Sequence, residues 1–154
     1  MRIIVSTFLI LICFLAKGQD TAVDSAEAKI EKYYNIGISD SMRTYLKSQI
    51  KHMDKYLAQD TLNPKAFLQR GIYYTQLGAQ VKAIKDYDKT IELDSLEPVA
   101  YYNRGIAKGR FRYTLDACFD LKRANQLGLK EAGDIYKSYC RLYHTQIEKK
   151  FVTK

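Results

Sequence analysis

The stretch PKAFLQRGIYYTQLGAQVKAIKDYDKTIELDSLE (Pro64–Glu97) is followed without a gap by PVAYYNRGIAKGRFRYTLDACFDLKRANQLGLKE (Pro98–Glu131). Both stretches have the same length. We call this length, which is the separation along the chain between Pro64 and Pro98, the repeat period. A repeat of this length is typical of solenoids, in which each unit buries its apolar face only by stacking on a neighbour. The two copies are identical at nine aligned pairs: Pro64/Pro98, Ala66/Ala100, Arg70/Arg104, Gly71/Gly105, Ile72/Ile106, Ala83/Ala117, Asp86/Asp120, Leu93/Leu127 and Glu97/Glu131.

The spacing of apolar residues within each copy predicts two helices. In the first copy one helical face carries Ala66, Phe67, Gly71 and Tyr74, and a second carries Ala83, Ile84, Tyr87 and Ile91. Gly78 lies between them, where a turn is needed. Pro64 fits the first helical turn, because the N–H it lacks has no partner there.

At these residues the chain resembles the tetratricopeptide repeat family. That pattern is a large aromatic residue, a Leu-Gly pair, an aromatic residue, and then Ala-x3-aromatic in the second helix. The resemblance implies an all-α fold, a right-handed α-solenoid of about three helical hairpins plus a C-terminal capping helix. It also implies that Gly71, Ala83, Gly105 and Ala117 lie where two helices approach closely. The matching residues are Phe67, Arg70-Gly71, Tyr74, Ala83 and Tyr87, then Tyr101, Arg104-Gly105, Ala117 and Leu121.

A third, degenerate copy covers residues 30–63. Gln49–Pro64 matches Ala83–Pro98 at seven of sixteen positions, and Gly37 lies one repeat period before Gly71. After the copies at 64–97 and 98–131, residues 132–148 continue the apolar periodicity for one more helix. We interpret that helix as a solubilising cap, followed by a basic tail at 149–154.

Two arginines replace the usual Leu of the family pattern. Arg70 precedes Asp86 by the same number of residues as Arg104 precedes Asp120. In a helical hairpin these positions meet, which predicts a half-buried ion pair in each copy. The alternative is that all four side chains are solvated.

Residues 1–18 have the features of a secretory signal peptide. Arg2 precedes an apolar run at 3–16, and Ala16-Lys17-Gly18 is an acceptable cleavage site. This predicts an exported protein, periplasmic or secreted, with a lead-in at 19–29 and no integral membrane span in the mature chain. An uncleaved anchor, or a lipoprotein attached through Cys13, is the alternative.

Cys118 and Cys140 are the cysteines that remain after such processing. They fall in helices expected to be neighbours, and export favours a disulfide between them. The alternative is two ordinary small buried side chains.

The sequence offers no catalytic or metal site. His52 and His144 have no partners at metal-ligand spacing, and no phosphate-binding loop or hydrolase motif is present. We therefore expect neither an enzyme nor a cofactor.

Charge is the remaining feature. The formal net charge of +8 falls to +6 when Arg2 and Lys17 are removed, and Arg104, Lys108 and Arg110 contribute to a basic C-terminal half. This surface either attracts an acidic polymer or surface, or serves only solubility. Export disfavours nucleic acid as a partner.

The family resemblance implies a concave groove lined by the first helices of successive repeats. Asn35, Gln69 and Asn103 share one equivalent position there. The expected function is a non-catalytic adaptor that binds a protein or peptide segment, with binding of an acidic polymer as the alternative and self-association as a further option. The implied groove residues are Tyr34, Asn35, Ile38, Leu68, Gln69, Ile72, Gln76, Tyr102, Asn103, Ile106 and Arg110.

Overall fold

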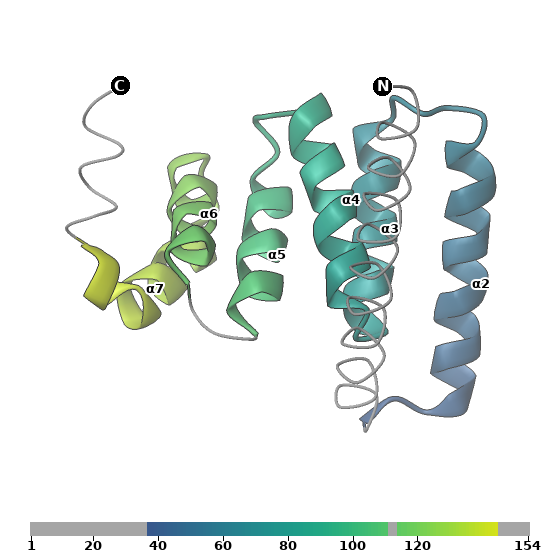
Figure 1. Ribbon diagram of the computed structural model, residues 1–154, viewed down its shortest axis with the longest axis horizontal. Coiled ribbons are helices and arrows are strands. Elements are labelled where there is room, and N and C mark those ends of the chain that lie inside the picture. Colours follow the sequence, from purple (N-terminus) through teal and green to yellow (C-terminus); the bar gives the residue numbers. More distant parts are fainter. Residues whose placement is uncertain (1–36, 111–113, 145–154) are drawn as a thin grey trace, which may run out of the picture.

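A computed structural model describes residues 37–110 and 114–144, and all of the regular structure in these ranges is helical. The helices follow one another as neighbouring antiparallel elements along one axis (Figure 1). The fold is therefore an all-α solenoid, as the sequence predicts. Its elements are α2 (Asp40–Leu57), α3 (Pro64–Gln76), α4 (Gln80–Leu93), α5 (Pro98–Gly109), α6 (Leu115–Gln126), α7 (Lys130–Tyr139) and the 3-10 turn η2 (Arg141–Tyr143).

The two strong copies of the repeat are the hairpins α3–α4 and α5–α6. Helix α3 begins at Pro64, and the side chain of Asn63 accepts a hydrogen bond from the backbone N–H of Ala66 at 3.2 Å. Thr114 caps α6 in the same way. Gly78 has a φ of 80°, which suits the tight turn between α3 and α4.

Small residues let the helices of each hairpin approach closely. A Cβ built on Gly71 would lie 2.6 Å from the ring of Tyr87, and one on Gly105 would lie 3.0 Å from the carbonyl oxygen of Ala117. Ala83 and Ala117 are fully buried at these crossings. Larger side chains would force the hairpins apart.

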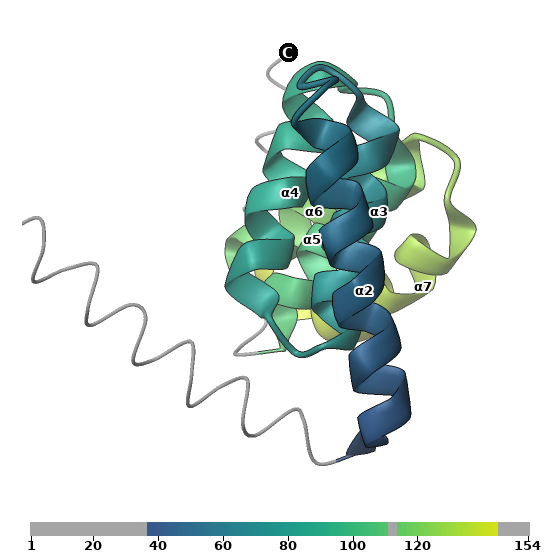
Figure 2. The same cartoon turned by 90° about the vertical axis from the view of Figure 1, so that its right-hand side faces the viewer.

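The hairpins stack through contacts between the second helix of one repeat and the first helix of the next. Helix α2 packs on α3, α4 on α5, and α6 on α7. Figure 1 places α2 at one end of the stack and α7 at the other, and Figure 2 shows α7 on the same side as α3 and opposite α4. Each of these three contacts is called a seam below.

The sequence-based prediction fails at the start of α2. Ser39 caps this helix by accepting a hydrogen bond from Met42 N–H at 3.3 Å, so α2 begins well before the position equivalent to Gln80, the first residue of α4. Ile38 therefore lies in the segment before α2 and cannot be a groove residue of a first helix. Gly37 is exposed, and no described atom lies within 4 Å of a Cβ built on it, so it does not mark a close helix crossing.

The C-terminal cap also differs from the prediction. The α-helix begins at Lys130 and ends at Tyr139, where Cys140 turns the chain into η2, instead of running over 132–148. Cys118, Leu121 and Ala132 form a buried cluster with Cys140, and the Sγ atoms of Cys118 and Cys140 lie at disulfide-bonding distance. None of the described helices combines the length and the apolar character that crossing a bilayer requires.

Candidate functional site

Arg70 connects three helices beneath the candidate groove. Its Nε and one terminal nitrogen donate to both carboxylate oxygens of Asp86 on α4, at 2.8 and 2.6 Å. Its other terminal nitrogen donates to Asp54 on α2 at 2.7 Å. The intra-hairpin ion pair predicted from the sequence is therefore present, and the same guanidinium also crosses the seam to the preceding repeat.

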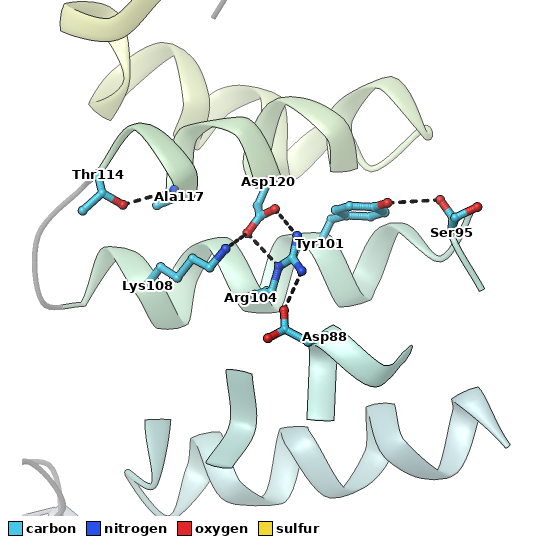
Figure 3. Close-up of polar contacts among 8 residues, drawn as sticks. All are labelled: Asp88, Ser95, Tyr101, Arg104, Lys108, Thr114, Ala117 and Asp120. Atoms are coloured by element: carbon cyan, nitrogen blue, oxygen red, sulfur yellow. Dashed lines mark hydrogen bonds and ion pairs between the residues drawn. The ribbon is translucent and has the colours of Figure 1, made fainter. Parts of the chain in front are cut away.

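Arg104 repeats this arrangement one unit later (Figure 3). It donates to both carboxylate oxygens of Asp120, at 2.9 and 2.6 Å, and to Asp88 on α4 at 2.6 Å. Lys108 also donates to Asp120, at 2.9 Å. The lysine that replaces the family's aromatic residue thus adds a third charge-assisted hydrogen bond to one buried carboxylate.

Burial lowers the pKa values of the two guanidinium groups, whereas pairing with carboxylates raises them. Hydrogen bonding to Asp86 raises the pKa of Arg70 above its ordinary value, while burial lowers it. Burial lowers the pKa of Arg104, but the hydrogen bond to Asp120 and the charge of that residue outweigh it, so that the pKa is raised. Both arginines therefore stay charged, and each guanidinium group binds carboxylates on two neighbouring helices at once.

The sequence analysis missed the carboxylates that cross the seams. Asp54 and Asp88 are one repeat period apart, and the chain separation from each to the arginine that it binds is 16. Each arginine is therefore preceded by an aspartate at the same separation at which Asp86 or Asp120 follows it. Both of the missed side chains are about half exposed, at 50% and 54%.

Within the described residues, the predicted groove positions lie on α3 and α5, apart from Ile38. Tyr34 and Asn35 lie outside the described residues, as do the predicted signal peptide at 1–18 and the lead-in at 19–29. On α3, Leu68 and Ile72 are half-buried, while Gln69 and Gln76 are exposed. This face therefore offers apolar contacts beside polar groups.

Gln69 and its equivalent Asn103 both carry uncommitted carboxamides. Gln69 is exposed and Asn103 is half-buried. Among the residues that the structure describes, neither side chain makes a hydrogen bond, whereas the polar groups beneath them are densely paired. Each carboxamide keeps two donors and one acceptor oxygen for an incoming molecule.

Two apolar residues of α5 that are predicted to line the groove also contact the C-terminal core. Tyr102 and Ile106 are half-buried because they pack against the C-terminal cluster around Leu121 and Cys140. Arg110, at the end of α5, is exposed. These two residues of α5 are thus held in place by α6 and α7. Within residues 37–110 and 114–144, no three His, Cys, Asp or Glu side chains gather where they could hold a metal ion.

Comparisons with known proteins agree with this architecture at the level of the fold. No protein-family model and no curated protein matches the sequence. Among solved structures, the chain is similar to the first TPR of Spaghetti (RPAP3), described as bound to the HSP90 peptide SRMEEVD. The TM-score is 0.58 at 20% identity, over 75% of this chain and 94% of that one. The predicted resemblance is thereby confirmed, and the chain has the tetratricopeptide repeat fold.

Proposed function

We propose that this chain, with its tetratricopeptide repeat fold, is a non-catalytic adaptor that binds an extended peptide or protein segment along the first helices of its repeats. The observation that carries the proposal is the pair of uncommitted carboxamides, Gln69 and Asn103, at equivalent positions of α3 and α5. An extended peptide presents backbone N–H and C=O groups that such carboxamides can bind. Half-buried Leu68 and Ile72 supply apolar contact beside them.

The similar RPAP3 domain supports a peptide as the ligand class, because its description names a bound HSP90 peptide. The family's clamp for a chaperone C-terminal carboxylate uses Lys, Asn and Arg side chains, however. The equivalent positions here are Tyr34, Ile38, Gln69, Val99 and Asn103. We therefore do not transfer that specialised activity, and a different peptide is expected.

Selection of peptides from a random displayed library tests this function. Peptides enriched on the intact protein are synthesised. Calorimetry then measures their affinities for the intact protein and for the double variant Gln69→Ala/Asn103→Ala. Losing two hydrogen-bonding groups should weaken binding about tenfold or more. Gln59→Ala is the matched control, since Gln59 is an exposed carboxamide outside α3 and α5. Equal affinity for the groove variant and the control, or no enriched peptide, would refute the proposal.

We also propose that the adaptor is exported and matures in an oxidising compartment. The apolar run at 3–16 supports this, as does the placement of Cys118 and Cys140 at bonding distance. Mass analysis of the protein from its native host distinguishes the options. A chain that begins at Gln19 supports export, whereas an intact N-terminus with both thiols reduced contradicts it.

A further inference from the structure

The last of the three seams carries a positive charge at the positions where each of the two seams before it carries a neutral Asp–Arg pair. At the seam between α2 and α3, Asp54 binds Arg70, and at the next seam Asp88 binds Arg104. The positions one repeat period further along are Lys122 on α6 and Ser138 on α7. An acidic residue is thus replaced by a basic one, and its arginine partner by a neutral residue.

A hollow of about 340 Å³ lies at this last seam, between α6, α7 and η2. Three of its lining side chains are Lys or Arg and a fourth is His, and no Asp or Glu is among the described residues that line it. We call it the C-terminal hollow. Its lining residues are Lys122, Asn125, Gln126, Gly133, Tyr136, Lys137, Cys140, Arg141 and His144.

Substitutions within the repeat account for two of the polar side chains that line this hollow. Asn125 and Gln126 stand where the preceding repeat has Ile91 and Glu92, so an apolar and an acidic side chain have become neutral amides. Gly133 has no side chain, and a Cβ built on it would lie 2.8 Å from Cγ of Asn125. The glycine therefore lets α7 approach the amide side of α6.

The C-terminal hollow also continues the row of groove positions. Tyr136 and Lys137 lie one repeat period after Tyr102 and Asn103, and His144 lies one period after Arg110. Helix α7 lies on the same side of the stack as α3 (Figure 2). The position that holds a carboxamide in α3 and α5 thus holds an ammonium group in α7.

We propose that the C-terminal hollow binds the carboxylates of an acidic peptide segment, at the end of the peptide nearest α7. This proposal rests on the proposed function, which supplies the ligand class, a peptide. It adds that the end of the peptide nearest α7 is acidic. Arg141 can bind a carboxylate with two parallel hydrogen bonds. Lys137 is available because its contact with Asp134 is 4.0 Å long and both side chains are about four-fifths exposed, at 78% and 82%.

Fluorescence anisotropy with a fluorescein-labelled hexaglutamate peptide tests the site. The double variant Lys137→Gln/Arg141→Gln removes two positive charges from the hollow. Lys47→Gln/Lys51→Gln is the matched control, since both lysines are exposed on α2, at the opposite end of the stack (Figure 1). We expect affinity for hexaglutamate to fall about tenfold or more in the hollow variant and less than about twofold in the control.

The outcomes separate this site from general charge attraction and from the groove. Equal losses in the two double variants would mean a diffuse basic surface and overturn the site, as would unchanged binding in both. Heparin serves as a second probe. The proposed site is overturned if heparin binds more tightly than hexaglutamate and if its affinity falls equally in the hollow variant and in the control variant. The proposed function is read separately, from library peptides and the Gln69→Ala/Asn103→Ala variant. Either idea can therefore fail while the other stands.

Discussion

The substitution Asp120→Asn tests whether the buried carboxylate between α5 and α6 holds the last complete repeat together. Asp120 accepts three hydrogen bonds, two from Arg104 and one from Lys108, and its side chain is 6% exposed. Asn has nearly the same size and shape, so the change creates no cavity. It removes the negative charge and points an amide donor or a single neutral oxygen at two cations.

The expected decrease in the free energy of unfolding follows from how deeply Arg104 and Lys108, the partners of Asp120, are buried. Breaking a buried ion pair by removing one member costs about 3–5 kcal/mol. Arg104 and Lys108 are 17% and 26% exposed, so water relieves part of the cost and about 3 kcal/mol is expected. Asp88→Asn is the comparison, since Asp88 binds the same arginine but is 54% exposed. Its loss should stay below about 1 kcal/mol.

Equilibrium urea denaturation followed by helical circular dichroism measures both variants, with the disulfide state matched by mass analysis. With a slope of about 1.5 kcal/mol per molar urea, the midpoint for Asp120→Asn should fall by about 2 M. The shift for Asp88→Asn should be less than half as large. Equal losses in the two variants, or a loss below about 1 kcal/mol for Asp120→Asn, would refute the reasoning.

Three further predictions use the same unfolding assay. Gly71→Ala should destabilise the protein by about 1–3 kcal/mol, because the new methyl group meets the Tyr87 ring, whereas Gly37→Ala should have almost no effect; similar losses at both glycines would contradict the assigned crossing. Burial raises the pKa of Tyr87 to about 12 from its ordinary value of 10.0, so the neutral phenol is favoured in the folded state. The contribution of the neutral phenol is intact below pH 10.0 and is lost as pH rises to about 12, so between these values the free energy of unfolding should fall more steeply with pH in the wild type than in Tyr87→Phe; parallel pH curves would exclude this. Reducing the bond between Cys118 and Cys140, which closes a separation of 22 residues, should lower stability by about 3 kcal/mol, and an unchanged midpoint would show that the bond is absent or without effect.

The sequence predicts the fold and the ion pairs well because both depend on spacing. The repeat period fixes which helices neighbour each other, and the fixed separation between Arg70 and Asp86 places the two side chains opposite each other in the hairpin. The same separation also precedes the arginine, at Asp54, but the prediction considers only the two helices of one hairpin. The information is present in the sequence, but it concerns contacts between repeats.

The failures have a different physical cause. The predictions for Gly37 and Ile38 carry the repeat period into the degenerate copy, but local capping at Ser39 starts α2 earlier than the period requires. A good cap and a first-turn Asp40 stabilise that start. Local signals therefore override the repeat register at the start of α2. The groove residues Tyr34 and Asn35 lie beyond the described residues, so their placement stays a prediction.

The cysteines show how the stack ends. Cys118 and Cys140 lie one repeat period after Ile84 and Ile106, and Ile50 and Ile72 lie one period before those. Two seams thus have isoleucines at these positions together with an Asp–Arg pair, whereas the last seam has cysteines, with Lys and Ser at the positions of that pair. Among the described residues, α7 packs on α6 and η2, and the Asp–Arg pair of the earlier seams has no equivalent there. The bond between the cysteines holds α7 to α6 in place of that ion pair, and polar side chains beside it line the C-terminal hollow that we propose as a carboxylate site.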